Sequence, residues 1–488
     1  MIISSLLHEV PALADCLDQD SLKMLLATNK QLRQQLRCLV SRATPKTREH
    51  LDHLVTRDWQ HLKALQLTGF KLEDRDVWQL SYGDWPRLTS LDLTSTGLRE
   101  SAVPQLVRAH WPLLEHLSVA NNPVQLSQLV LGKWPLLKTL DLDDVHVTDW
   151  DIHTLVSSCW TNLESLNLGQ TGISPAAVAM LSQANWPQLK RLYLDNEDLD
   201  HTAVASLTQG NWPELEVLDL CAVTLNPAVA GLLARANWKK MKHLDLTLCS
   251  MGSEGFALLA QADWPLLRLL NVGSNEEGLE KWATEGLKHA RWPLLQVLDL
   301  SVTLQGIGPT AISHLVQGSW PLLRVLKLDH NYLEVESMAE LVKGNFPSLQ
   351  KLDLSCSCFN AVSMKHLAKG KWPLLGILDL SETQICFQAL HHLMKGRWHN
   401  LECLDVADNK LGASSFVLLT GDKKREWKRG VNQFSVPGNI ANGMWPKLRV
   451  LDFGDRSNQL FTHWPESREE RKRRRSFGSV PYCDLAYW

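Results

Sequence analysis

The sequence predicts an α/β solenoid of about fifteen units of ~26 residues, a horseshoe with parallel strands on its concave face and helices on its convex face. An aromatic residue recurs along the chain, and ten of the thirteen steps from Trp59 to Trp398 are 26 residues long, with one of 23 and two of 28. The aromatic positions are Trp59, Trp85, Trp111, Trp134, Trp160, Trp186, Trp212, Trp238, Trp264, Trp292, Trp320, Phe346, Trp372, Trp398 and, after an insertion, Trp445. A fixed period of this length indicates a repeat architecture.

Aliphatic residues fall three, six and eight places after each aromatic residue, as in Leu163, Leu166 and Leu168. Eleven places after it stand Asn, Thr or Cys in most units, as in Asn122 and Cys249. These positions complete the pattern of a leucine-rich repeat. The last two of these aliphatic residues are separated by one residue, and this period of two predicts a short strand with one buried face. Because the pattern recurs after 26 residues, the next strand is expected to lie parallel beside it.

A helix is expected between successive strands. Leucine stands five residues before the aromatic residue in every unit up to Trp398, as at Leu80, Leu181 and Leu315. Glycine often stands two residues before it, where a helix end favours a left-handed residue, at Gly83, Gly132, Gly210, Gly318, Gly344, Gly370 and Gly396. The predicted N-caps are Ser101, Ser174, Asn226 and Ser253, with Pro104 and Pro175 in the first turn.

The chain has 20 tryptophans, and fourteen of them occupy the same place in the repeat. An aromatic cage or a base-stacking platform would not require a fixed period over the whole chain. We therefore predict that these tryptophans form a buried spine between adjacent units.

The strand position seven residues after the aromatic residue is expected to face the hollow side, and nine of its fifteen residues are Asp. The candidate partner-binding residues at this position are Asp92, Asp141, Tyr193, Asp219, Asp245, Asp299, Asp353, Asp379 and Asp405. Two interpretations are open: the aspartates keep an exposed sheet soluble, or they attract a protein with a basic surface. A ladder of carboxylates would repel nucleic acid. Tyr193 is the best single candidate for an interface anchor.

Composition narrows the other classes of function. A net charge of −3 over 488 residues favours neither a polyanion nor a membrane as a general partner, and we expect a monomer. Ten cysteines without paired spacing, no signal peptide and no long apolar run indicate a soluble protein of the cytoplasm or the nucleus. Phosphate-loop, Cys-x-x-Cys and His-Glu-x-x-His motifs are missing, so no catalytic residue, cofactor or metal is predicted.

Residues 1–40 lack the repeat and predict two short amphipathic helices. They resemble an F-box: Leu6, Glu9 and Val10 match its opening, Leu17, Ser21 and Leu22 its middle, and Leu25, Thr28, Asn29, Lys30, Leu32 and Arg33 its end, although Leu7 stands where the motif has Pro. An F-box followed by such repeats is similar to the F-box/leucine-rich-repeat proteins, whose solenoid is of the ribonuclease-inhibitor type. This resemblance implies that Leu6, Glu9, Val10, Leu17, Leu22, Leu25 and Leu32 bind the Skp-type adaptor of a cullin (SCF-type) ubiquitin ligase, while the repeats hold the substrate.

The alternative is a leucine-rich-repeat interaction scaffold without a ubiquitin role, in which residues 1–40 only cap the first repeat. In either case the expected organisation is an F-box-like segment at 1–40 and a linker with an incomplete first repeat at 41–58. The solenoid follows at 59–456, with a basic insertion at about 421–444, and a basic disordered tail at 457–488. The run Arg471 to Arg475 in this tail resembles a nuclear import signal, and a solvated charged tail is the other interpretation.

Overall fold

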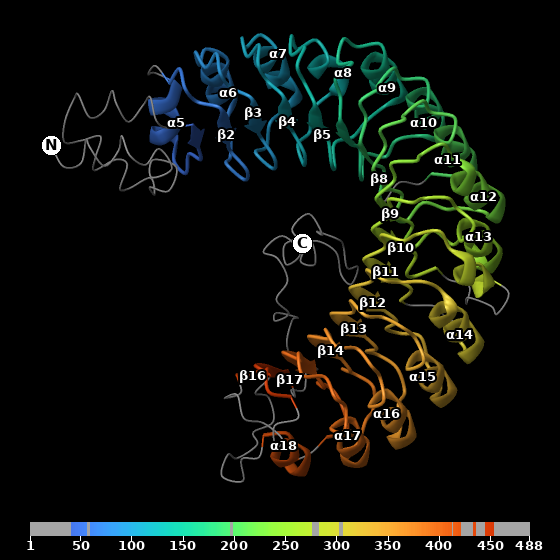
Figure 1. The fold of residues 1–488 in the computed structure, drawn as a ribbon. Helices are drawn as coiled ribbons and strands as arrows, with labels where there is room; N and C mark the ends of the chain where they lie inside the picture. The colour runs from blue at the N-terminus through green and yellow to red at the C-terminus, as the bar shows by residue number, and fades with distance from the viewer. Residues whose placement is uncertain are drawn as a thin grey trace. The chain divides into compact units, whose positions relative to one another are not determined.

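The computed structural model describes residues 41–55, 59–195, 199–275, 283–301, 306–411, 413–420, 433–435 and 445–452 (Figure 1). The chain divides into two compact units between Val325 and Leu326, here called unit 1 and unit 2. The F-box-like segment 1–40, the tail 457–488 and all but three residues of the basic insertion lie outside the described residues. No helix among the described residues is long and apolar enough to cross a membrane.

The sheet of unit 1 is a parallel ladder in which each strand pairs with the next in the sequence. Its strands are β1 (Arg42–Ala43), β2 (Ala64–Gln66), β3 (Ser90–Asp92), β4 (His116–Ser118), β5 (Thr139–Asp141), β6 (Ser165–Asn167), β7 (Arg191–Tyr193), β8 (Val217–Asp219), β9 (His243–Asp245), β10 (Leu269–Asn271) and β11 (Val297–Asp299). Each strand from β2 onward follows one of the aromatic residues. β1 lies before the first aromatic residue, so the ladder begins earlier than the repeat pattern indicates.

The helices of unit 1 cover one face of the sheet (Figure 1). We call the opposite face of the sheet, which none of the described helices of unit 1 covers, the strand-lined face. The helices are α5 (Arg48–Val55), α6 (Asp74–Ser81), the 3₁₀ turn η1 (Glu100–Ala102), α7 (Val103–Leu106), α8 (Leu126–Leu129), α9 (Asp149–Val156), α10 (Pro175–Leu181), α11 (His201–Leu207), α12 (Pro227–Arg235), α13 (Gly252–Leu259), the 3₁₀ segment η2 (Ala283–His289) and α14 (Pro309–Gln317). α8 has only four residues, because its unit is the one shortened to 23 residues.

β12 (Val325–Lys327) lies at the boundary between the units. Unit 2 repeats the same alternation with α15 (Val335–Leu341), β13 (Lys351–Asp353), α16 (Ala361–Leu367), β14 (Ile377–Asp379), α17 (Phe387–Leu393), β15 (Cys403–Asp405), α18 (Ala413–Thr420) and β17 (Val450–Asp452). Strands β13, β14, β15 and β17 are parallel, whereas β16 (Gln433–Ser435), inside the insertion, pairs antiparallel with β17. The protein is thus an α/β leucine-rich-repeat solenoid, as predicted.

The core consists of the residues that the repeat pattern marks. The three leucines of each strand segment are at most 1% exposed in most units, as at Leu163, Leu166 and Leu168. The predicted tryptophan spine is confirmed, since the described repeat tryptophans are at most 5% exposed. Some neighbouring indoles stack, with ring centroids 6.3 Å apart for Trp85 and Trp111 and 6.1 Å apart for Trp134 and Trp160. Burial of such large side chains in every unit ties each repeat to the next.

In many repeats a buried polar side chain closes the turn after the strand. Asn122 accepts a hydrogen bond from the Leu98 N–H (2.9 Å) in the preceding repeat. Its Nδ2 donates to the carbonyl oxygens of Leu93 (2.7 Å), Val119 (2.9 Å) and Ala120 (3.0 Å). Where the position holds threonine, the hydroxyl donates to one carbonyl, as Thr171 does to Leu168 (2.8 Å). This position therefore satisfies backbone groups that the turn would otherwise leave buried and unpaired.

The glycines before the tryptophans have a different role from the predicted one. None of those that the structure describes has a positive φ, so the expectation of a left-handed helix end is wrong. A β-carbon on Gly370 would stand 2.5 Å from a ring atom of Trp372, and Gly83, Gly132, Gly210, Gly318 and Gly396 are equally close to the tryptophan that follows. Glycine is present because the indole packs directly on the backbone.

Two of the four predicted N-caps are confirmed. The side chain of Ser174 accepts from the Ala177 N–H, and that of Asn226 from the Val229 N–H. Ser101 lies inside η1 and Ser253 inside α13, because both elements begin two residues earlier than N-caps at these serines would imply. The two prolines do lie in the first turns of α7 and α10.

Candidate functional site

The candidate partner-binding residues of unit 1 form one row across the strand-lined face. The register aligns Asp92, Ser118, Asp141, Asn167, Tyr193 and Asp219 on strands β3 to β8. Asp245, Asn271 and Asp299 continue the row on β9 to β11. Asp353, Asp379 and Asp405 are aligned in the same way in unit 2.

The carboxylates of this row shape the end of each strand. Oδ1 of Asp92 accepts from the Thr94 N–H two residues later (2.9 Å), and Oδ1 of Asp219 accepts from the Cys221 N–H (3.0 Å). The same bond recurs at Asp141, Asp245, Asp299, Asp353, Asp379 and Asp405. The frequency of aspartate at this position thus has a structural cause that neither interpretation of the sequence included.

The aspartates of this row differ in how much of each side chain is exposed. Asp245, Asp299, Asp379 and Asp405 are between 2% and 6% exposed, so the expectation of an exposed acidic strip is wrong for them. Asp92, Asp141, Tyr193, Asp219 and Asp353 are half-buried. Reversing the charge of Asp245 or Asp299 would therefore disturb the fold as well as the surface. The accessible part of the row in unit 1 lies on β3 to β8.

Asp141 shows how confined this part of the face is. Burial raises the pKa of its carboxyl, and the neighbouring Asp92 carboxylate raises it further. Hydrogen bonds from Ser118 (2.9 Å), the Asp143 N–H and Asn167 act in the opposite direction, but the net direction is upward. The largest cause of this upward shift is the removal of the carboxyl from water, so it chiefly reflects the burial of Asp141 on this part of the face.

Two further carboxylates face each other beside Tyr193. A β-carbon on Gly169 would stand 2.9 Å from Oδ1 of Asp143 and 2.5 Å from Oδ1 of Asp195. A side chain at this position would force the carboxylates to move, and both of them border the space above the Gly169 backbone. Asp195 lies in the turn two residues after Tyr193, the last residue of β7, so the space between the carboxylates lies just beyond this end of the strand. We call Asp143, Gly169 and Asp195 the carboxylate gap.

A second set of charges runs along the N-terminal ends of the strands and was not predicted. Four places after the aromatic residue, glutamate and lysine alternate over six successive repeats: Glu115, Lys138, Glu164, Lys190, Glu216 and Lys242. Nζ of each lysine lies 2.8 to 3.0 Å from the glutamate of the preceding repeat. The hydrogen bond from Lys190 lowers the pKa of Glu164. The signal was visible in the sequence only by comparing the same position across repeats.

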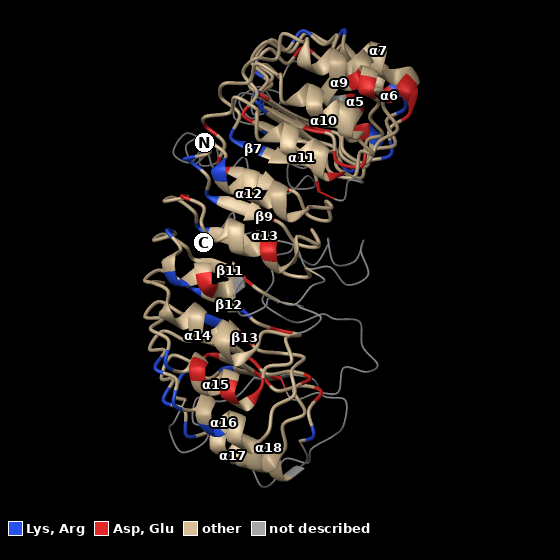
Figure 2. Cartoon of the chain, turned by 90° about the vertical axis from the view of Figure 1, so that its right-hand side faces the viewer, with Lys and Arg blue, Asp and Glu red and all other residues tan. Residues whose placement is uncertain are grey.

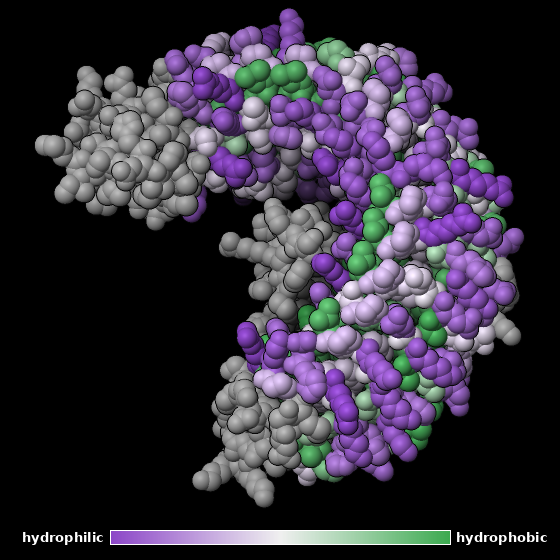
Figure 3. All heavy atoms as spheres, viewed as in Figure 1, coloured by the Kyte–Doolittle hydropathy of each residue, from purple (hydrophilic) through white to green (hydrophobic). Residues whose placement is uncertain are grey.

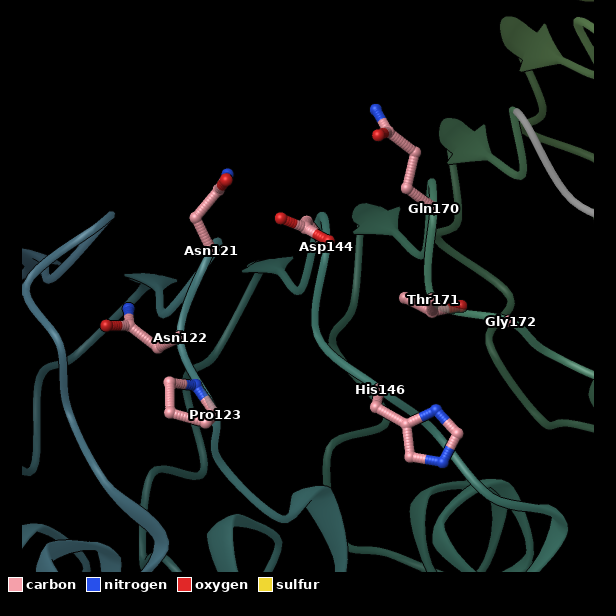
Figure 4. A pocket seen from close by; sticks show the side chains of 8 residues that line it. All are labelled: Asn121, Asn122, Pro123, Asp144, His146, Gln170, Thr171 and Gly172. Carbon is pink, nitrogen blue, oxygen red and sulfur yellow. The ribbon is translucent and has the colours of Figure 1, made fainter. Parts of the chain in front are cut away.

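A shallow hollow of about 530 Å³ lies on the loops after β4, β5 and β6 (Figure 4). Its lining residues are Asn121, Asn122, Pro123, Asp144, His146, Gln170, Thr171 and Gly172. Asn121 and Gln170 extend away from His146, so the polar groups do not converge on one point. The described residues contain no group of three His, Cys, Asp or Glu side chains arranged to hold a metal ion, and the described cysteines are free thiols.

The buried carboxyl of Asp379 in unit 2 leads to a prediction about how the stability of the fold depends on pH. Burial raises its carboxyl pKa well above the ordinary 3.8, and the Asp353 and Asp405 carboxylates raise it further. Such a group destabilises the fold when ionised, so this penalty is removed as the pH falls from the raised folded pKa to the ordinary value. We expect Asp379→Asn, whose amide oxygen still accepts from Ser381, to raise the melting temperature at pH 7 and to match the parent near pH 4. Asp92→Asn, at a half-exposed place of the same repeat position, is the control, and a variant D379N less stable than the parent at pH 7 would refute the assignment.

The sequence matches no protein-family model and no curated protein. Solved structures with a similar fold include a leucine-rich-repeat protein of Leptospira interrogans, 20% identical, with a TM-score of 0.44 over 73% of this chain and 87% of that chain. An internalin of Listeria monocytogenes is 17% identical (TM-score 0.38; 75% and 84%), and a chain of the Rad7 and Elc1 complex in yeast is 18% identical (TM-score 0.45; 65% and 81%). At these identities the likeness concerns the repeat fold alone.

Proposed function

We propose that this chain is a non-catalytic protein-interaction protein whose strand-lined face on β3 to β8 holds a basic surface of a protein partner. The observation that carries this proposal is the carboxylate gap beside Tyr193. Two carboxylates held around one glycine would accept a lysine or arginine side chain of the partner through charge-assisted hydrogen bonds. Tyr193 would supply the apolar contact that anchors such an interface.

The remaining acids of the face would act at longer range. Asp92, Asp141 and Asp219 lie on the same row, half-buried and held by backbone N–H groups. Carboxylates fixed in this way lose little conformational freedom when a partner binds. Their summed field would speed association with a basic surface and exclude acidic ones. Accordingly, binding should weaken as the salt concentration rises.

For the role of the bound partner, we propose that it is a substrate delivered to a cullin ubiquitin ligase. The support is the F-box-like sequence of residues 1–40, followed directly by the repeat ladder that starts at β1. In this proposal Leu6, Glu9, Val10, Leu17, Leu22, Leu25 and Leu32 contact a Skp-type adaptor, and the protein acts in the cytoplasm or nucleus.

The test of the face compares two double variants in the full chain. Asp143→Asn with Asp195→Asn removes both charges of the carboxylate gap while keeping the shape of the side chains. Asp84→Asn with Glu254→Gln removes the same charge from exposed positions away from the carboxylate gap, in the corner before Trp85 and on α13. We expect the first pair to weaken the binding of partners, identified by mass spectrometry and then purified, by about tenfold or more, since charge-assisted hydrogen bonds contribute about 1.5–3 kcal/mol each. The control pair should bind like the parent, and equal binding by both pairs would refute the proposal.

The test of the adaptor is co-purification with a Skp-type protein. We expect the parent to retain the adaptor, and the variant Leu22→Asp with Leu25→Asp to lose it while melting as the parent does. If deletion of residues 1–40 collapses the repeats and the parent never retains the adaptor, the segment is only a cap and the protein is an interaction scaffold without a ubiquitin role. Because the carboxylate gap is unchanged in these variants, this result would leave the proposal for the strand-lined face standing.

A further inference from the structure

The alternating charge ladder ends abruptly within unit 1. After Lys242 the alternation would require an acid, but the next three repeats hold Arg268, Gln296 and Arg324. Backbone hydrogen bonds connect these residues as successive rungs: the Arg268 N–H donates to the Lys242 carbonyl (2.7 Å), the Gln296 N–H to Arg268 (2.8 Å) and the Arg324 N–H to Gln296 (2.7 Å). The ladder therefore changes from neutral to basic at β10.

The two arginines differ from the lysines before them. Lys242 is paired with Glu216 at 2.8 Å, whereas neither Arg268 nor Arg324 forms an ion pair with a carboxylate of the described residues. Both side chains are exposed. The charge of Arg268 acts on the nearby His243. Burial lowers the pKa of the His243 imidazole, and the positive charges of Arg268 and Lys242 lower it further. An excess of positive charge thus lies at the N-terminal ends of β9 to β12.

An apolar side chain accompanies each arginine. Leu266 and Leu322 stand two residues before Arg268 and Arg324 and are 37% and 40% exposed. Leu294 has the same place beside Gln296 and is half-buried. Figure 3 shows hydrophobic residues on the viewer's side near β8 to β10, and Figure 2 shows Lys and Arg along the edge near β9 and β11. We call Leu266, Arg268, Leu294, Gln296, Leu322 and Arg324 the basic edge.

We propose that the basic edge is a second docking surface, which binds an extended acidic segment of a protein partner. Arg268 and Arg324 stand two strands apart, which is about 10 Å at ~4.8 Å per strand. An extended polyproline II chain rises about 3.1 Å per residue and has three residues per turn, so carboxylates three residues apart would lie on one side of the chain and match the two guanidinium groups. The leucines would contact an apolar side chain between them. This site is independent of the strand-lined face, which selects the opposite charge.

The probe is a fluorescein-labelled peptide with glutamate at every third position and a leucine between two of them, measured by fluorescence anisotropy with the full chain at low ionic strength. A peptide with glutamine in place of every glutamate is its control. We expect the parent to bind the acidic peptide and not the glutamine peptide. Arg268→Gln and Arg324→Gln should each weaken binding about threefold to fivefold, as exposed ion pairs do, and the double variant by about tenfold or more.

The matched variant is Arg75→Gln with Arg99→Gln, which removes two exposed arginines from elsewhere in unit 1 and should bind the acidic peptide like the parent. No binding by the parent, or equal binding by the parent and the R268Q/R324Q variant, would overturn the proposal. A single-stranded oligothymidylate that binds more tightly than the peptide, with the same dependence on both arginines, would also overturn it and identify a nucleic-acid surface instead.

Discussion

Replacing Leu218 by aspartate is expected to unfold several neighbouring repeats of unit 1 together. Leu218 is the central residue of β8, 1% exposed, and its register partners are Leu192 and Leu244. An aspartate there would place an unpaired carboxylate between two leucines, at a cost of about 4 kcal/mol or more. Because each repeat is stabilised by its neighbours, the damage should extend along the ladder.

Hydrogen exchange measures this extent directly. The backbone amides of β7, β8 and β9 should lose protection together in Leu218→Asp. The control is Val217→Asp, one residue earlier, because the Val217 side chain is half-buried on the opposite side of the strand. This variant should retain most of the protection, and loss of protection confined to β8 in Leu218→Asp would contradict a stack stabilised by neighbouring repeats.

Replacing Asn122 by leucine should destabilise unit 1 by about 3–5 kcal/mol, although the two side chains are similar in size. Asn122 is 2% exposed and satisfies the Leu98 N–H and three carbonyl oxygens. A leucine would remove all four bonds. The Ala120 carbonyl would keep the Ser95 N–H and the Leu93 carbonyl the Thr96 hydroxyl, but the Leu98 N–H and the Val119 carbonyl would be left buried and unsatisfied. Each such group costs about 1–3 kcal/mol, in addition to the lost hydrogen bonds.

Denaturant unfolding of Asn122→Leu measures the loss. Asn162→Ala is the control, since the exposed Asn162 makes one hydrogen bond, to the Pro135 carbonyl (2.9 Å), and its removal should cost less than about 1 kcal/mol. Equal stability of Asn122→Leu and the parent would show that the turn rearranges without the asparagine.

The fold could be predicted because the same spacing of aliphatic residues after one aromatic residue recurs in fifteen units. Leucines at fixed places and one tryptophan per unit specify strand, corner and core, and single substitutions such as Phe346 do not hide the period. The strand β1 was missed because residues 41–43 lack the aromatic residue that marks the other units. It forms nevertheless, since β2 offers it a free ladder edge and the Lys63 N–H bonds to the Ser41 carbonyl (2.8 Å).

The face was harder to predict, because an alternating pattern gives the side of a strand but not the depth of each residue. Asp92 and Asp299 occupy the same repeat position, yet the first is half-buried and the second is 3% exposed. The local bond from each carboxylate to the N–H two residues later was also invisible in the repeat pattern. The carboxylate gap depends on Gly169 and on two aspartates in different repeats, which are brought together only by the register of the sheet.

The most direct test of the central claim is photo-crosslinking from the strand-lined face itself. A benzoylphenylalanine placed at Tyr193 lies beside the carboxylate gap, whereas the same group at Tyr82, 68% exposed at the end of α6, lies on the helix side of unit 1. We expect irradiation to link the partner through position 193 and not through position 82, with loss of the product in the D143N/D195N variant. A partner that crosslinks only through position 82 would contradict binding on the strand-lined face.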